Sequence, residues 1–455
     1  MKTEVKNFTE GPITGPLVKF MLPILLALIL QALYGAVDLL VVGRFARSAD
    51  ISAVATGSQL MTTVTNTMAT FSTGVTILLG HQIGQGRSRE GGRTIGASIL
   101  LFFVIGLVVT AVLVIFAGNF AGLLKAPREA YTRTVSYIRI CGAGSLVIIF
   151  YNMIGAVFRG IGDSNTPLVT VAIATVVNIF GDLFNVAVLG MGAAGAALAT
   201  VAAQAVSVFA SIRFIRKRQL PFEFRREMIR ADRPITRQVA KFGFPIALQD
   251  FLVGVSFLVI NAIVNGLGLV PSAGVGVAEK VCAFIMLVPS AFSQSLAAFV
   301  AQNYGAGKFR RAFRTLYIAF GLSLCAGFAM FWLAFFHGTL LTGIFTKETQ
   351  VIEAGADYLK SYAIDCILTA FLFCFIGFFN GLGMTSFVMV QGLVGAFCVR
   401  IPVSYFMSRQ VPVSLFHIGL ATPCSSLVQI LLCLIFMIYA KKKMFWKTDE
   451  KGHPG

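Results

Sequence analysis

The sequence predicts an all-α integral membrane protein with about twelve transmembrane helices, arranged as two parallel six-helix repeats. Three observations support this fold class: the apolar composition, a set of motifs that occurs twice, and the placement of the basic residues. Hydrophobic residues make up 57% of the 455 residues and charged residues only 12%, with a mean hydropathy of +0.83. Soluble domains average about 25% charged residues. The composition therefore excludes an ordinary soluble fold.

Long apolar segments follow one another along the chain, and a bilayer-spanning helix needs about 20 such residues. The first segment is too long for the apolar part of a signal peptide, so we expect it to be retained as a helix. We expect helices over 16–43, 53–82, 94–118, 134–160, 166–189, 194–217, 238–267, 275–303, 312–337, 352–381, 385–408 and 413–440.

A polar, basic stretch divides this series into two sets of six. We expect residues 218–237 to form a cytoplasmic linker between an N-terminal lobe, 1–217, and a C-terminal lobe, 238–440. Residues 441–455 are expected to form a basic cytoplasmic tail. Six helices is an even number, so the second lobe enters the membrane from the same side as the first, which makes the repeats parallel.

Three short motifs occur once in each half, at nearly the same spacing. The pairs are Val18–Ile24 with Ala240–Ile246, Gly84–Gly86 with Gly305–Gly307, and Arg159–Gly162 with Asn380–Gly383. A fixed offset across half a chain indicates duplication. In a membrane protein, duplication favours a transporter whose binding site lies between the halves.

The basic residues explain the net charge of +18. Most of them lie in alternate connections between the predicted helices, which is the positive-inside pattern of cytoplasmic loops. Both termini are therefore expected in the cytoplasm, in a multi-pass protein of the cell inner membrane. We expect the charge to contact lipid headgroups, and we expect no nucleic-acid partner.

Acidic residues inside predicted helices are the strongest site candidates, because each costs about 2.5–3.5 kcal/mol at the bilayer centre. Gln31, Tyr34 and Asp38 share one stripe of the first helix. Asn178 and Asp182 are one turn apart on the fifth. At 1.5 Å per residue, Asp38 lies roughly 33 Å and Asp182 roughly 24 Å from the cytoplasmic ends of their helices.

Thr200 lies roughly 10 Å from the outer end of the sixth helix, at a similar depth. Two carboxylates, an amide and a hydroxyl at one level predict a site for a proton or Na⁺, formed by Asp38, Asn178, Asp182 and Thr200. The alternative is that each Asp is a hydrogen-bonded structural residue. Further polar residues are candidates for lining a substrate cavity: Gln31, Tyr34, Asn66, Asn152, Ser293 and Gln294.

The second half carries acids and bases together. These residues could neutralise one another or take part in substrate or ion binding, and the sequence favours neither reading: Asp250, Glu279, Lys280, Asp365 and Arg400. Elsewhere, Gly305–Lys308 resembles the end of a phosphate loop but lacks its upstream glycine and its Ser or Thr. The histidines have no metal-ligand spacing. We therefore expect neither an enzyme nor a cofactor, and an ion gradient as the energy source.

The ordered motifs resemble those of the multidrug and toxic compound extrusion (MATE) family across essentially the whole chain. The motifs that carry the resemblance include Gln31-x-x-Tyr34-x-x-x-Asp38, Phe158–Ser164, Asn178-x-x-x-Asp182, Gly192–Thr200 and Arg400–Pro402. The resemblance implies a twelve-helix, two-lobed, V-shaped exporter, expected as a monomer, that exchanges cytoplasmic organic compounds for H⁺ or Na⁺.

The DinF-like branch of that family is similar to this chain in its N-lobe cation site, which matches Asp38, Asn178, Asp182 and Thr200. The NorM-like branch has acids where this chain has Val253 and, near the equivalent helix 10 position, Thr369.

We therefore expect an antiporter for cationic or neutral amphipathic compounds. The alternative is a flippase for a lipid-linked or polysaccharide precursor, for which a cavity rich in basic residues is expected. The hypotheses of a membrane enzyme or a receptor give no role to the paired acids.

Overall fold

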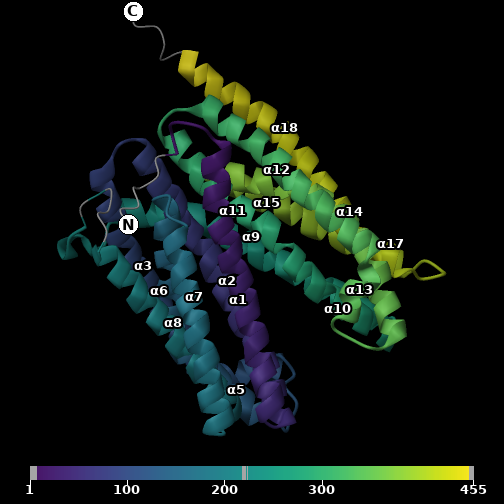
Figure 1. Cartoon of the computed structure of the whole chain (residues 1–455). Helices are drawn as coiled ribbons and strands as arrows, with labels where there is room; N and C mark the ends of the chain where they lie inside the picture. Colours follow the sequence, from purple (N-terminus) through teal and green to yellow (C-terminus); the bar gives the residue numbers. More distant parts are fainter. Residues whose placement is uncertain (1–7, 218–221, 223, 450–455) are drawn as a thin grey trace, which may run out of the picture. The chain divides into compact units, whose positions relative to one another are not determined.

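The computed structural model describes residues 8–217, 222 and 224–449, and all regular structure in these residues is helical (Figure 1). The chain forms two compact units. The first contains residues 1–11 and 15–247, and the second contains residues 12–14 and 248–455. An all-helical chain is what a bilayer demands, because every backbone N–H and C=O must find a partner inside its own segment.

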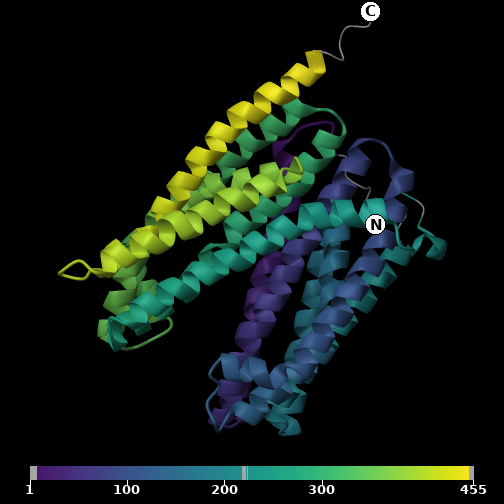
Figure 2. The same cartoon turned by 180° about the vertical axis from the view of Figure 1, so that it is seen from behind.

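The first unit is a bundle of long helices with short connecting turns (Figures 1 and 2). Its elements are α1 (Thr14–Phe45), α2 (Ser48–Gly84), α3 (Ser88–Ile115), α4 (Ala117–Leu123), α5 (Tyr131–Ala143), α6 (Ser145–Gly160), α7 (Asn165–Asp182), the π-helix η1 (Leu183–Val188), α8 (Gly192–Lys217), the 3₁₀-helix η2 (Arg226–Met228) and the first part of α9 (Arg233–Asn265).

The second unit contains the rest of α9 and the helices that follow it. They are α10 (Leu269–Ile285), α11 (Leu287–Gly305), α12 (Phe309–Phe336), α13 (Gly338–Gly343), α14 (Thr349–Gly381), α15 (Thr385–Leu393), the π-helix η3 (Val394–Arg400), α16 (Ile401–Ser408), α17 (Leu415–Gly419) and α18 (Ala421–Asp449). Helix α14 is the most deeply buried span, and it packs against α10, α11, α12 and α18.

The all-helical membrane fold is confirmed. Among the described residues, ten helices are long and apolar enough to span a bilayer, or eleven if the pair α5 and α6, bent by 49°, is one span. The predicted helix at 53–82 is α2, a continuous helix of 37 residues. It falls outside that count because Thr, Ser, Asn and Gln side chains interrupt its apolar sequence.

Helix boundaries differ from the predicted ones at several places. The predicted helix 275–303 is two helices, α10 and α11, and 385–408 contains a π-helical stretch. Helix α18 continues to Asp449, so the predicted tail begins inside a helix, and residues 450–455 lie outside the described part of the chain. Of the predicted linker, residues 218–221 and 223 also lie outside it.

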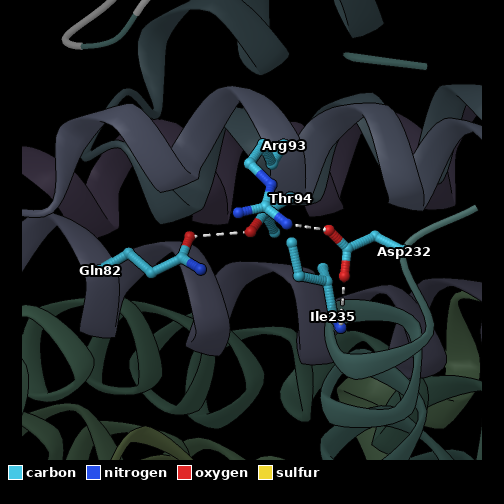
Figure 3. A network of polar contacts seen from close by, with 5 residues as sticks. All are labelled: Gln82, Arg93, Thr94, Asp232 and Ile235. Carbon is cyan, nitrogen blue, oxygen red and sulfur yellow. Dashed lines mark hydrogen bonds and ion pairs between the residues drawn. The ribbon is translucent and has the colours of Figure 1, made fainter. Parts of the chain in front are cut away.

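The end of the linker is fixed to the first unit by one polar network (Figure 3). Arg93 of α3 forms an ion pair with Asp232 at 2.5 Å, and the Ile235 amide donates to the other oxygen of Asp232 at 3.4 Å. Beside it, the Thr94 hydroxyl donates to Gln82 of α2 at 2.9 Å. Asp232 thus caps α9 and ties its first turn to α3.

Small residues let the helices of the first unit approach closely. A Cβ atom at Gly74 of α2 would lie 2.7 Å from the Gly243 amide nitrogen of α9. A Cβ at Gly181 of α7 would lie 2.9 Å from the Ala199 Cβ of α8. Backbones this close are typical of transmembrane helix interfaces. The crossing at Gly181 and Ala199 brings the residues that follow them, Asp182 and Thr200, to the same level.

We predict that Gly181→Val destabilises the protein by about 1–3 kcal/mol, because the added side chain must push α7 away from α8. The melting temperature of the purified protein measures this. Gly35→Val is the matched control, since a Cβ at Gly35 of α1 meets no atom within 4 Å. Equal melting temperatures for the two variants would contradict the close crossing.

Candidate cation site

Three helices of the first unit bring their acidic and polar side chains to one place. Asp38 comes from α1, Asn178 and Asp182 come from the last turn of α7, and Thr200 comes from α8. Asp182 is the last α-helical residue before the π-helix η1. A π-helical stretch inside a long helix is rare and occurs frequently at functional sites. The four residues predicted from the sequence are thus gathered in a single cluster.

Direct hydrogen bonds join only part of this cluster. The Thr200 hydroxyl donates to Asp38 Oδ2 at 3.3 Å, and the Tyr34 hydroxyl donates to the Thr200 carbonyl oxygen at 3.4 Å. Asp38 is 5% exposed, and Asn178 and Asp182 are fully buried. Both lie close enough to Asp38 to interact with it electrostatically. The cluster is therefore a buried site with two acids and, among its four members, no base.

The remaining polar atoms of the cluster have no hydrogen-bonding partner in the structure. These atoms are Asp38 Oδ1, both carboxylate oxygens of Asp182, and both polar atoms of the Asn178 amide. A buried polar atom without a partner costs about 1–3 kcal/mol, and more if it is charged. Such groups normally pair with something. A shared proton satisfies two carboxylates, and oxygen atoms from carboxylates, an amide and a hydroxyl suit a hard cation such as Na⁺. The residues present fit either ion.

An ion pair outside the cluster holds α8 in position. Asp50 of α2 is buried, forms an ion pair with Arg133 of α5 and accepts a hydrogen bond from the Ala193 amide at 3.1 Å. Gly192, at φ +55°, precedes this contact and leaves room for the carboxylate. Ala193 lies two helical turns before Thr200, so Asp50 fixes the height of Thr200. No sequence signal marks this pair, because Asp50 falls in a predicted loop.

The proposed cavity residues have different environments. Gln31 donates to the Tyr151 hydroxyl at 3.0 Å, and Asn66 is exposed on α2. Asn152 is buried, and its amide donates to the Ile148 carbonyl at 2.9 Å, which is a contact within its own helix. Ser293 and Gln294 are half-buried on α11 of the second unit. Gln31 and Asn66 are thus exposed, Tyr34 is half-buried, and Asn152 is bonded within its own helix.

The acids and bases of the second unit do not form one ion-pair network. Arg400 is buried, donates to the Ser256 hydroxyl at 3.1 Å and lies 4.4 Å from the centre of the Phe257 ring. Asp365 is also buried and lies within electrostatic range of Arg400. Among the described residues, however, no ion pair within 4 Å joins the two.

The other three charges of that half are separate from Arg400. Glu279 accepts a hydrogen bond from the Asn261 amide at 3.0 Å, and Lys280 lies 6.0 Å from the centre of the Phe345 ring. Asp250 is exposed. Among the described residues, no ion pair within 4 Å joins Glu279, Lys280 and Asp250, and Glu279 Oε1 has no hydrogen-bonding partner.

We predict that Asp182→Asn stabilises the protein by about 1–3 kcal/mol at alkaline pH and low Na⁺, because it removes a buried carboxylate whose two oxygens both lack partners. Acid or Na⁺ should raise the melting temperature of the wild type but not of the variant, because a ligand stabilises only the protein that binds it. Asp50→Asn is the control, and it should lower the melting temperature. A destabilised Asp182→Asn variant that still responds to cations would contradict the cluster's role.

Comparisons with known proteins agree on the family. The family model MatE matches residues 23–184 and again residues 245–406, and the two matches begin at the repeated prolines Pro23 and Pro245. The chain is 26% identical over 447 residues to the probable multidrug resistance protein YpnP of Bacillus subtilis (strain 168), covering 98% of this chain and 99% of that protein.

It is 23% identical over 449 residues to the probable multidrug resistance protein YoeA of the same organism, covering 95% of this chain and 94% of the relative. The fold matches an outward-facing structure of a multidrug resistance MATE family transporter with a TM-score of 0.89, at 16% identity, over 99% of this chain and 100% of that one. The chain therefore belongs to the MATE family of multi-pass membrane transporters.

Proposed function

We propose that this transporter is a secondary active multidrug exporter, which exchanges cytoplasmic organic compounds for H⁺ or Na⁺ through the cluster of Asp38, Asn178, Asp182 and Thr200. The observation that carries the proposal is the set of five buried polar atoms in this cluster that lack partners. A structural cluster would satisfy them within the protein. A site that alternately binds and releases a cation leaves them open in one state.

The coupling step is a shift between inward-open and outward-open states. A cation shifts this equilibrium only if it binds one state more tightly than the other. Asp38 lies on α1, and its partners lie on α7 and α8, so a bound cation draws three helices together. If the cation binds one arrangement of these three helices more tightly, it favours the inward-open or outward-open state in which the helices have that arrangement.

The energy of one cation is sufficient. A charge moving down a membrane potential of about 150 mV releases about 3.5 kcal/mol. A tenfold substrate gradient needs about 1.4 kcal/mol. One H⁺ or Na⁺ per substrate therefore supports a gradient of a few hundredfold.

The charge of the cluster favours cationic or neutral amphipathic substrates, because two acids with no base among them attract positive charge. The family relatives named above are multidrug resistance proteins, which supports the multidrug character. The positive-inside pattern supports a plasma-membrane protein with both termini in the cytoplasm, and we expect a monomer. A flippase for an anionic lipid-linked precursor gains no support from this acidic cluster.

We predict that Asp38→Asn and Asp182→Asn each abolish cation-driven efflux of a cationic dye while leaving expression intact, because the remaining carboxylate no longer binds the coupling cation. Fluorescence of the dye in inverted vesicles measures this. Asp250→Asn is the control, since this exposed acid of the second unit is outside the cluster, and it should retain efflux. Full dye transport by Asp38→Asn would overturn the assignment.

The coupling ion can be identified in the same vesicles. With a pH gradient and a Na⁺ gradient imposed separately, one of them should drive dye efflux at low voltage. The Asp38→Asn vesicles should respond to neither. If both gradients fail for the wild type while dye binding persists, the antiport proposal is wrong.

A further inference from the structure

A cavity lies at the opposite end of the first unit from Thr200, away from the cation cluster. It has a volume of about 700 Å³ and is lined by side chains of α3, α6, α8 and the linker. Among the residues that the structure describes, every lining residue is apolar except Arg216. A cavity of this size is in the range that holds a bound ligand. We call it the linker cavity.

The linker cavity is buried on its α6 side and open on the side of α8 and the linker. Met153 is 2% exposed and Phe158 is 1% exposed, whereas Ile212 is 40% and Ile229 is 42% exposed. Arg216, also exposed, stands with Ile212 and Ile229 at the open end. A molecule that enters here would keep a polar end near Arg216 and bury an apolar end among α3, α6 and α8.

By the positive-inside pattern, the open end is expected near the lipid headgroups, because the basic residues Arg213 and Arg216 lie in the last turns of α8. Val208, which also lines the cavity, lies eight residues earlier on α8, roughly 12 Å deeper at 1.5 Å per residue. The cavity therefore runs from the headgroup layer into the hydrocarbon layer, along the direction of a lipid acyl chain.

The linker forms a fixed part of the wall. Phe224 and Ile229 line the cavity, and the linker backbone lies directly on α3, because a Cβ at Gly96 would be 2.5 Å from the Met228 carbonyl carbon. The ion pair between Arg93 and Asp232 holds the same segment (Figure 3). A ligand in this cavity would contact both the helices and the linker, and would stabilise their packing.

The charge at the open end decides which amphipathic molecule fits. Among the described residues, none forms a hydrogen bond or an ion pair with Arg216. A guanidinium without a partner attracts phosphate and repels the organic cations proposed as substrates. Basic residues beside the membrane attract anionic lipids, at about 1 kcal/mol each. We propose that the linker cavity binds an acyl chain of an anionic phospholipid, with its headgroup phosphate at Arg216.

The test is the binding of phosphatidylglycerol and of phosphatidylcholine with identical acyl chains, followed through the melting temperature of the purified full chain and by native mass spectrometry. We expect phosphatidylglycerol to bind about fivefold more tightly than phosphatidylcholine. Arg216→Gln should abolish this preference. Arg213→Gln is the control, because Arg213 is exposed on the same helix but does not line the cavity.

A second pair of variants tests the apolar part. Val208→Phe fills the cavity and should weaken the binding of both lipids. Val206→Phe, on a neighbouring exposed position outside the cavity, should not. Both pairs are needed, because the headgroup contact and the acyl-chain contact are separate parts of the proposal.

Several results would overturn the proposal. Equal binding of the two lipids by the wild type is one, and equal behaviour of Arg216→Gln and Arg213→Gln is another. Inorganic phosphate that stabilises as well as the lipid would reduce the site to an anion site. A cationic dye that displaces the lipid from the wild type would assign the cavity to the transported substrates.

Discussion

Polar groups inside a bilayer have no water to bond to, and the structure follows from this constraint. Backbone groups meet it by forming helices over nearly the whole chain. Side chains meet it by bonding within their own helix, as Asn152 does, or to a neighbouring one, as the Thr76 hydroxyl does with the Ala156 carbonyl. The cluster around Asp38 is the main exception in the first unit, since five of its polar atoms have no partner. The free-energy cost of burying these five atoms is explained if a bound proton or Na⁺ satisfies them.

The packing around the cluster holds the helices that carry its partnerless polar atoms in position. Gly181 and Ala199 bring α7 and α8 together just beside the site. Asp50 and Arg133 fix the first turn of α8, two turns before Thr200. These contacts are satisfied and close, whereas the partnerless polar atoms of the site belong to Asp38, Asn178 and Asp182. A site with partnerless polar atoms, held by well-packed helices, can bind one small cation. Coupling requires that this cation binds one state of the transporter more tightly than the other.

The sequence predicted the helical fold, the duplication and the members of the cluster, because each leaves a local or periodic signal. Asp38 and Asp182 stood out as acids in apolar segments, and Pro23 and Pro245 marked the repeat. Four features left no such signal. The π-helix after Asp182 and the bend between α5 and α6 depend on packing between helices. The pair of Asp50 and Arg133 joins residues distant in sequence. The linker cavity depends on where residues 224–229 fold back onto α3.

The most direct test of the cation site is the infrared difference spectrum of the protein between acidic and alkaline conditions, recorded with and without Na⁺. The account predicts a carboxyl band that gains or loses a proton, or is displaced by Na⁺, and that disappears in both Asp38→Asn and Asp182→Asn but persists in Asp250→Asn. A spectrum whose carboxyl bands are the same in the wild type and in the two cluster variants would contradict it.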